Sequence, residues 1–164
     1  LRQDDIAEVI GYSGSGKELD IPETVQGHVV TRVAPFAFSR QRQITAVSIP
    51  DTVDSIGQEA FYICPSLQQL KLPARLKIIG KNAFNYCRAL KSVIVPTGTI
   101  HIDRHAFYDC TALKTISIPD AVGFMGEKVF GADGDAKVEC TIVCRQDSYV
   151  EHYAKENGIL CSFV

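Results

Sequence analysis

Apolar and polar positions recur along this chain with a constant step of 23 residues. One column is an Ala-Phe pair, replaced by Val-Phe in its last copy, and another is an apolar residue followed by Pro. The aromatic pairs begin at Ala37, Ala60, Ala83, Ala106 and Val129, and the prolines are Pro50, Pro73, Pro96 and Pro119. Because a single coil cannot bury its own Leu, Ile and Phe side chains, this repeat predicts a solenoid of stacked coils.

The repeat from Leu67 to Cys87 indicates how one coil is built. Leu70 and Leu72 alternate with polar residues, which is typical of a short strand whose Leu side chains point inward. Pro73 then ends the strand, because it has no backbone N–H to donate to a neighbour. Stacked copies of this coil over residues 21–135 predict a body of about five coils.

Two other parts of the repeat predict its turns. Gly57, Gly80 and Gly126 share one column, and glycine there supplies a residue that is free to adopt positive φ. The segment Ala83–Cys87 fits one short helical or 3₁₀ turn that buries Phe84. The predicted coil therefore consists of one strand, one glycine turn and one short helical turn.

The N-terminal flank departs from the repeat, as a solenoid end must, because an unmodified end exposes apolar surface and strand edges. Residues 6–10 and 18–21, with a Gly/Ser-rich segment between them, predict a hairpin cap within residues 1–20. Ile21-Pro22 resembles the apolar-Pro pair of the repeat, but Pro22 and Pro50 are 28 residues apart instead of 23. The first coil is therefore expected to carry a five-residue insertion near residues 26–29.

The C-terminal segment 136–164 predicts a second cap. Ser148 and Glu151 form the capping-box pattern that begins a helix, since each side chain satisfies an otherwise unpaired backbone N–H. Gly158 suits the position just after a helix. A helix over 148–157 is therefore expected to cover the last coil, followed by a closing strand.

Composition excludes several classes of protein. The chain has 164 residues, 46% of them apolar and 22% charged, which fits a single folded domain spanning residues 1–164. Its net charge of −2 gives no electrostatic footprint for nucleic acid or an anionic membrane. No apolar run approaches the ~20 residues of a membrane-spanning helix, and no signal peptide is visible. We expect a monomer that does not insert into membranes.

The segment Gly11–Lys17 matches the Gly-x-x-x-x-Gly-Lys string of phosphate-binding loops, and an apolar run precedes it. Such a loop needs Ser or Thr after the Lys to hold Mg²⁺, and a helix whose N-terminus faces the phosphates. Position 18 is Glu, and Pro22 prevents a helix of useful length from beginning there. The segment is interpreted as a turn, and no nucleotide or other cofactor is expected.

The pattern Leu-x-x-Leu-x-Leu-Pro-x-x-Leu-x-x-Ile-Gly-x-x-Ala-Phe-x-x-Cys at Leu67–Cys87 resembles the BspA-like leucine-rich repeat. The resemblance covers roughly residues 20–135. Departures from the pattern are Gln41, Thr99, Asp103 and Val129. The resemblance implies an α/β solenoid: a leucine-rich-repeat-like right-handed coil with stacked short parallel strands, short helical or 3₁₀ turns and a cap at each end.

The same resemblance carries an expectation about function. Members of this family are mostly bacterial cell-surface or secreted proteins, and those with a known role bind proteins or matrix components. It implies a non-enzymatic recognition scaffold, extracellular or at the cell surface, with a protein, extracellular-matrix or glycan partner. The alternative is a structural spacer of a larger surface protein, with no ligand of its own.

The six cysteines fall into two groups. The first group is a column of the repeat and consists of Cys64, Cys87 and Cys110. We expect these thiols to be buried and to donate weak hydrogen bonds to neighbouring turns. Cys140, Cys144 and Cys161 lie outside the repeat, and a disulfide from Cys161 to either of the other two stays open.

His101, Asp103 and His105 are the sharpest candidates for a metal site, because all three side chains share one face if the segment is extended. The repeat also accounts for each of these residues without a metal. Positions 101 and 105 belong to surface columns, and Asp103 replaces a turn glycine, where Asp tolerates the left-handed conformation. No Gly-x-Ser-x-Gly elbow accompanies the His and Cys residues. The sequence therefore predicts no catalytic residues and no functional metal site.

The outward positions of the predicted strands remain as the candidate binding face. Their columns are small and weakly charged, which suits a flat ledge that a partner can cover. The candidate partner-binding residues are Gln69, Lys71, Ser92, Ile94, Thr115 and Ser117. A second stripe, Tyr62, Tyr86 and Tyr108, fits an interface and packing over the short helices equally well.

Overall fold

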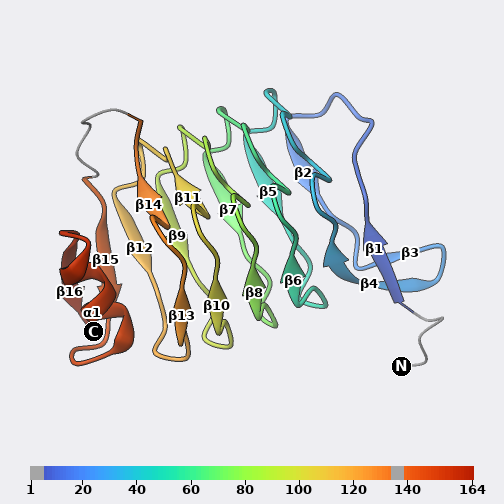
Figure 1. The fold of residues 1–164 in the computed structure, drawn as a ribbon. Coiled ribbons are helices and arrows are strands. Elements are labelled where there is room, and N and C mark those ends of the chain that lie inside the picture. Colours follow the sequence, from blue (N-terminus) through green and yellow to red (C-terminus); the bar gives the residue numbers. More distant parts are fainter. Residues whose placement is uncertain (1–5, 134–138) are drawn as a thin grey trace.

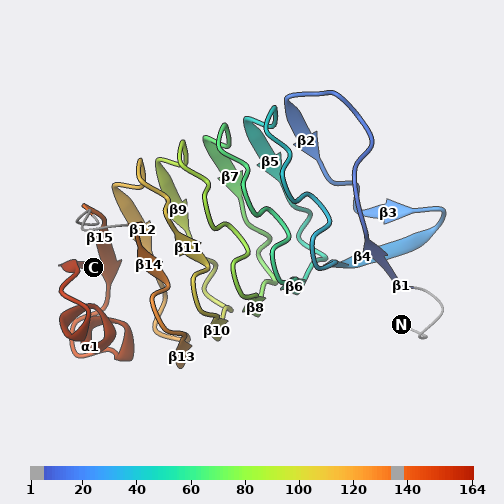
Figure 2. The ribbon, with the colours of Figure 1, turned by 45° about the horizontal axis from the view of Figure 1, so that its top comes forward.

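The computed structural model describes residues 6–133 and 139–164, and it confirms the predicted solenoid (Figure 1). The chain winds through about seven turns, with the N-terminus at one end of the stack and the C-terminus at the other. A tilted view shows that the strands of successive coils lie side by side along the body (Figure 2). Residues 1–5 and 136–138, which belong to the two predicted caps, lie outside the described residues.

Four sheets hold the coils together. The seven-stranded sheet contains β1 (Ile6–Val9), β3 (Thr24–Val25), β4 (His28–Val33), β6 (Ser55–Ile56), β8 (Ile78–Ile79), β10 (His101–Ile102) and β13 (Phe124–Met125). A three-stranded sheet contains β2 (Glu18–Asp20), β5 (Ala46–Ser48) and β7 (Gln69–Lys71). A four-stranded sheet contains β9 (Ser92–Ile94), β12 (Thr115–Ser117), β15 (Thr141–Cys144) and β16 (Leu160–Phe163). The last sheet pairs β11 (Phe107–Tyr108) with β14 (Phe130–Gly131), and helix α1 is Tyr149–Glu156.

The 23-residue step of the sequence sets the register in which the strands of neighbouring regular coils pair. β5 and β7 pair in parallel with Val47 opposite Leu70, and β9 and β12 pair in parallel with Val93 opposite Ile116. Each column of the sequence is therefore a row of side chains stacked along the solenoid. Inward rows form the apolar core, while their neighbours in the same strands face outward.

Phenylalanine rings form the most regular of these rows. The fully buried members are Phe38, Phe61, Phe84 and Phe107. Neighbouring rings in this set have nearly parallel planes and centroids 5.0 to 5.3 Å apart, and Phe130 continues the row at 6.0 Å. No coil could bury such a ring alone, so the stability of the fold comes from contacts between neighbouring coils.

The segments around these rings are hydrogen-bonded turns, and the prediction of short helical or 3₁₀ turns is wrong for the described residues. In one coil the N–H of Cys87 donates to Phe84, while the N–H of Phe84 donates to Ala106 of the next coil. This alternation uses left-handed residues, since Asn82 and Tyr86 have φ values of 56° and 62°. The turns thus extend the hydrogen bonding between coils, which a helix with internal bonds would not do.

A second strand in each coil occupies the place where the sequence predicts only a turn. These strands are β6, β8, β10 and β13, each two residues long. They pair in parallel within the seven-stranded sheet, with Ile56 opposite Ile79. A two-residue strand is too short to show alternation, so the hydrophobic pattern does not reveal it.

The glycine column has a different cause from the one predicted. Among the glycines of the described residues, only Gly27 and Gly158 have positive φ. A Cβ on Gly80 would lie 2.8 Å from the backbone carbonyl carbon of Gly57, closer than a side chain tolerates. The column is therefore required because the backbones of neighbouring coils approach each other closely there.

The predicted N-terminal hairpin is wrong. β1 pairs in parallel with β4, whereas β2 pairs in parallel with β5 in a different sheet. The two strands form a further turn of the solenoid, because Leu19 is buried in the row of Val47, which only stacking achieves. A hairpin does occur at the predicted five-residue insertion: β3 and β4 pair antiparallel and turn at Gln26 and Gly27, both with positive φ.

The predicted C-terminal helix is confirmed as α1. The Oγ of Ser148 accepts a hydrogen bond from the N–H of Glu151 at 3.2 Å, and Gly158 has a φ of 65° after the last turn. The predicted closing strand is β16, which pairs in parallel with β15. Because β16 continues the four-stranded sheet, the C-terminal segment adds both a helix and a further turn to the stack.

Candidate functional site

The candidate binding face is the outward side of the three-stranded and four-stranded sheets. Gln69 and Lys71 project from β7, Ser92 and Ile94 from β9, and Thr115 and Ser117 from β12. All six lie at exposed or partly exposed positions. However, β7 and β9 belong to different sheets, and within the described residues no strand pairing joins them. The predicted face is therefore divided between two surfaces with different properties.

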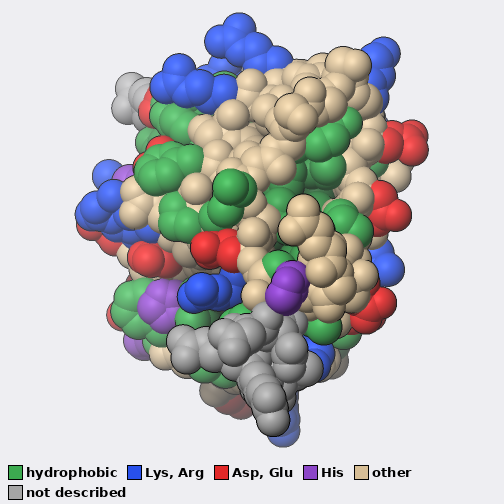
Figure 3. Space-filling view, turned by 90° about the vertical axis from the view of Figure 1, so that its right-hand side faces the viewer, with side chains coloured by type: hydrophobic (Ala, Val, Ile, Leu, Met, Phe, Trp, Pro, Cys, Tyr) green, Lys and Arg blue, Asp and Glu red, His purple; other side chains and the backbone are tan. Residues whose placement is uncertain are grey.

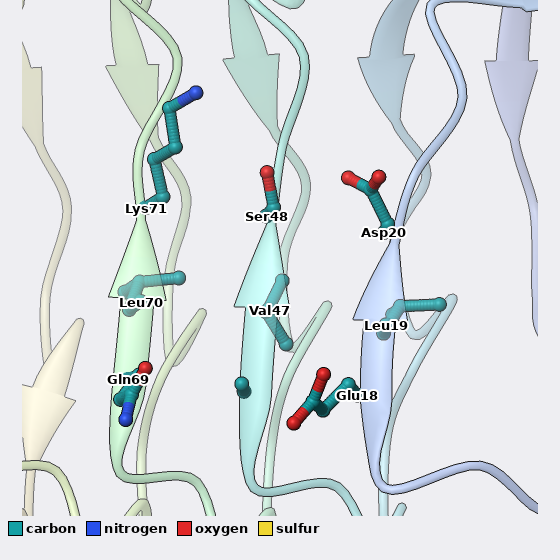
Figure 4. A pocket seen from close by; sticks show the side chains of 9 residues that line it. Glu18, Leu19, Asp20, Val47, Ser48, Gln69, Leu70 and Lys71 are labelled. Atoms are coloured by element: carbon teal, nitrogen blue, oxygen red, sulfur yellow. The ribbon is translucent and has the colours of Figure 1, made fainter.

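The first surface, which we call the trough, lies over β2, β5 and β7 (Figure 4). Its floor is β5, where Ala46 and Ser48 carry short side chains. Its walls are Glu18 and Asp20 on β2 and Gln69 and Lys71 on β7. The hollow has a volume of about 680 Å³. It exists because short side chains on the central strand lie between longer ones on its two neighbours.

The charged groups of the trough have no partner of opposite charge within the described residues. Glu18, Asp20 and Lys71 are exposed, and the ion pairs found in residues 6–133 and 139–164 all involve other side chains. One wall therefore carries two carboxylates and the other an ammonium group, with a neutral floor between them. Such groups are free to pair with charges of a bound molecule.

The second surface, which we call the neutral ledge, lies over the four-stranded sheet. Its outward residues are Ser92, Ile94, Thr115, Ser117, Thr141, Val143, Leu160 and Ser162. None of them is charged. Two of the basic groups beside the ledge are paired, since Lys114 lies 2.8 Å from Glu139 and Arg145 lies 3.1 Å from Asp120. Lys91, directly before β9, is exposed and makes no ion pair within the described residues. The ledge therefore offers hydroxyl and apolar groups but no free charge of its own.

The core beneath the two surfaces also differs. Leu70 on β7 is only partly buried, whereas the preceding and following members of its row, Val47 and Val93, are 3% exposed. The loss of burial coincides with the interruption between β7 and β9. The trough therefore lies next to the position where this inward row of side chains is least buried.

Several residues of these surfaces were not predicted. The sequence pattern places Glu18 and Asp20 in a cap, although Glu18-Leu19-Asp20-Ile21-Pro22 matches Ala46-Val47-Ser48-Ile49-Pro50 in apolar pattern. That match was detectable, but the five-residue insertion hides it from a search at a step of 23. The ledge residues of β15 and β16 carry no repeat signal, because their strands follow the last regular coil.

The column of repeat cysteines is a buried ladder of thiols, as predicted. The Sγ atoms of Cys64, Cys87 and Cys110 donate to the carbonyl oxygens of the Phe residues 26 positions earlier, at 3.2, 3.3 and 3.2 Å. Burial raises the pKa of Cys64 to about 11 and raises the pKa values of the other two as well. A raised thiol pKa is the reverse of what a nucleophilic cysteine needs.

The remaining cysteines are free thiols in the structure. Cys140 and Cys144 are buried and Cys161 is partly exposed. Burial raises the pKa of Cys140 to about 11, and burial together with the adjacent Cys161 raises that of Cys144 to about 11. These residues fill the last turn as small apolar groups.

The structure does not bring the predicted metal candidates together. His101 stacks on Phe124 with ring centroids 4.4 Å apart, and the carboxylate of Asp103 accepts a hydrogen bond from the N–H of Arg104 at 2.6 Å. His105 is the left-handed residue of its turn, with φ of 57°, so the left-handed conformation assigned to Asp103 lies two positions later. No cluster of potential metal ligands occurs among the described residues.

The tyrosine stripe makes mainly internal contacts. Tyr62 and Tyr86 meet edge to face at 5.9 Å, and the hydroxyl of Tyr86 donates to Asp133. The hydroxyl of Tyr108 donates to the carbonyl of Ala132 at 2.8 Å. Two of the three rings therefore fasten residues 132–133 to the preceding coils, which supports packing rather than an open interface.

The loop Gly11–Lys17 folds around the ring of Tyr12, which packs against the core. The hydroxyl of Tyr12 accepts a hydrogen bond from the N–H of Gly16 at 3.2 Å, and a Cβ on Gly14 would lie 2.3 Å from the ring. The glycines thus let the loop pass close to an aromatic side chain. It joins β1 to β2 and presents no helix N-terminus to a phosphate.

No helix among the described residues has the length and apolar character needed to cross a membrane.

Comparisons with solved structures give the same fold. A leucine-rich cell surface protein of Faecalibacterium prausnitzii is 28% identical, with a TM-score of 0.71 over 90% of this chain and 43% of its own. A leucine-rich repeat protein of Bacteroides capillosus is also 28% identical, with a TM-score of 0.60 over 80% of this chain and 90% of its own. A leucine-rich repeat protein of T. pallidum is 22% identical and shows the fold alone, with a TM-score of 0.63 over 99% of this chain and 92% of its own.

A search of the curated proteins gives no significant match. A family model does match: the BspA type leucine rich repeat region, in six copies over residues 12–137. This range includes β2 and the whole trough, and it agrees with the finding that the first turn extends the stack. Families of this repeat are generally non-catalytic scaffolds. The chain belongs to the BspA-type leucine-rich repeat family.

Proposed function

We propose that this protein is a non-enzymatic recognition scaffold, extracellular or at the bacterial cell surface, and that the trough contacts an extracellular protein. The observation that carries the proposal is the trough itself, a hollow of about 680 Å³ whose charged walls have no internal partners in the described residues. The repeat family and the cell surface protein among the similar structures support the location and the scaffold role.

The dimensions of the trough favour an extended polypeptide segment as its occupant. Neighbouring strands lie ~4.8 Å apart, so walls on β2 and β7 stand roughly two strand spacings apart, which leaves room for one extended chain above β5. An extended segment can lie along β5 over Ala46 and Ser48. Its basic side chains would meet Glu18 and Asp20, and an acidic side chain would meet Lys71.

Parallel strands make the floor of the trough rigid before binding. β2, β5 and β7 are held in register by backbone pairing, so little ordering is needed when a partner arrives. Matrix proteins and glycans both remain candidate partners. The unpaired charges support a protein, because a neutral glycan would leave the carboxylates of Glu18 and Asp20 without counter-charges.

The test is a binding screen with a matched variant. Purified wild-type protein is measured by biolayer interferometry against immobilised extracellular-matrix proteins and glycans. We expect binding to at least one matrix protein and its loss on replacing the walls of the trough, Glu18, Asp20, Gln69 and Lys71, together by alanine, with an unchanged Tm. Binding that survives this change would contradict the assignment of the contact to the trough. Failure to bind any member of the panel would favour the spacer role.

A further inference from the structure

The C-terminal end of the solenoid closes one of its sheets and leaves another open. Helix α1 covers the end near β13, where the hydroxyls of Tyr149 and Tyr153 accept hydrogen bonds from the N–H groups of Met125 and Val129 at 3.1 and 3.0 Å. The four-stranded sheet ends differently. Its last strand, β16, pairs with β15 on one side, and within the described residues no strand pairs with its other side.

The outer edge of β16 presents free backbone groups. The N–H of Val164 donates to the carbonyl of Cys144, so it points toward β15. Because backbone direction alternates along a strand, the N–H and C=O groups of Leu160 and Ser162 also point toward β15. Those of Cys161 and Phe163 point away from it and have no partner within the described residues.

The edges at the N-terminal end carry the protection that β16 lacks. β1 contains Glu8 and a shift of register next to it, and β2 contains Glu18 and Asp20. A view onto this end shows acidic and basic side chains around its apolar patches (Figure 3). Charges and irregularities of this kind keep edge strands from pairing with other chains.

In contrast, β16 and the residue after it read Leu-Cys-Ser-Phe-Val, with no charge and no proline. Its pairing with β15 is regular over all four residues. The apolar side chains at this edge are exposed: Leu160 by 70%, Phe163 by 51% and Val164 by 89%. A regular, uncharged edge with exposed apolar residues is a template for a further strand.

We propose that β16 is a self-association edge and pairs antiparallel with β16 of a second copy of this chain, forming a two-fold symmetric dimer. A two-fold contact uses the same patch on both copies and closes, so it brings together two uncharged strands. It also joins the two neutral ledges into one continuous sheet surface, because each four-stranded sheet ends at β16.

A head-to-tail contact is the competing arrangement, in which β16 of one copy meets β2 of the next. That contact places Glu18 and Asp20 beside a strand without basic residues, so neither carboxylate gains an opposite charge across the joined edge. It also does not close and would give filaments. The charge distribution of the two ends therefore favours the two-fold dimer.

The experiment measures mass against concentration by size-exclusion chromatography with light scattering. The wild-type protein is expected to shift with rising concentration from 18.0 kDa to twice that mass. Leu160→Lys with Ser162→Lys places like charges across the edge and is expected to hold the protein at the monomer mass. Ser92→Lys with Ile94→Lys is the matched control, since both residues are exposed on the same ledge but on β9, away from the edge.

Hydrogen exchange identifies the contact independently of the variants. In the proposed dimer the amides of Cys161 and Phe163 become protected as the dimer forms, because they pair across the two-fold axis. A wild-type protein that stays at 18.0 kDa up to its solubility limit overturns the proposal. So does a dimer in which these two amides stay unprotected, or a series of larger species. Circular dichroism confirms that each lysine variant is folded.

Discussion

The trough and the neutral ledge are built on the same repeat, yet they differ in every property that decides recognition. The trough has long charged side chains on either side of a low floor, and its charges are unpaired within the described residues. The ledge itself is uncharged, and at its margins Lys114 and Arg145 are paired with acidic residues, while Lys91 makes no ion pair within the described residues. Beneath the trough Leu70 is partly exposed, while beneath the ledge Ile116 is buried.

This difference shows that a solenoid can assign separate tasks to outward columns without changing its core. Inward rows are fixed by stacking, so substitution there costs stability. Outward residues of the same strands are free to vary, and only their length and charge separate a trough from a ledge. The charged surface suits contact with another protein, and the uncharged surface with its free edge suits contact with a second copy.

The largest expected effect is the loss of a buried side chain under the ledge. Ile116→Ala is expected to lower the free energy of unfolding by about 2–5 kcal/mol, because it leaves a cavity in a closed core. Leu70→Ala is expected to lower it by less, since Leu70 is already partly exposed. Urea denaturation of both variants compares the two values, and equal losses would mean that the core is as closed under the trough as under the ledge.

A smaller effect is expected where α1 covers the last regular coil. Tyr153→Phe removes a hydroxyl that accepts from the N–H of Val129 and donates to the carbonyl of Gly126. Leaving these buried groups unpaired is expected to cost about 1–3 kcal/mol of unfolding free energy. Tyr149→Phe is the control and is expected to cost less, because Tyr149 is exposed and its hydroxyl accepts one bond. Thermal unfolding gives the Tm of each variant. An unchanged Tm in both would show that these hydroxyls of α1 do not stabilise the end of the solenoid.

The thiol ladder predicts a fall in stability at high pH. The pKa of Cys64 rises on folding from 9.0 to about 11, because burial disfavours the thiolate. The folded state therefore holds this proton while the unfolded state loses it, so the free energy of unfolding declines as the pH rises from 9 toward 11. Cys64→Ala should flatten part of that decline in urea titrations at several pH values. An unchanged pH slope would show that this thiol is not buried as described.

The smallest effect is expected at Lys17, in the loop before the trough. Its carbonyl accepts the N–H of Thr45, but its side chain is exposed and outside the walls of the trough. Lys17→Ala should leave the Tm unchanged, and ATP should give no thermal shift with either protein. A shift with ATP in wild type that the variant loses would restore a phosphate-binding role to Gly11–Lys17.

The parts of the fold that could be predicted are those that repeat. The row of Phe84, the thiol ladder of Cys87 and the strand containing Leu70 all follow from one step of 23 residues, because stacking turns a sequence period into a spatial row. Helix α1 was predictable for a different reason. Ser148 and Gly158 are local signals that act on the backbone next to them.

The parts that could not be predicted depend on how neighbouring coils meet. Gly80 is needed for the approach of another backbone, which no single coil reveals. The interruption between β7 and β9 has no counterpart in the apolar pattern, since Leu70 looks like every other member of its row. The trough was missed because Glu18 and Asp20 lie before an insertion and were assigned to a hairpin that does not form.

The most direct test of the central claim compares the two surfaces by binding. Glu18→Gln with Asp20→Asn removes two negative charges from the trough, and Ser92→Lys with Thr115→Lys adds two positive charges to the ledge, so both variants change the net charge equally. Against the matrix protein that wild type binds, the trough variant should lose at least tenfold in affinity and much of its salt dependence. The ledge variant should bind as wild type does. The account is contradicted if the ledge variant loses binding and the trough variant keeps it.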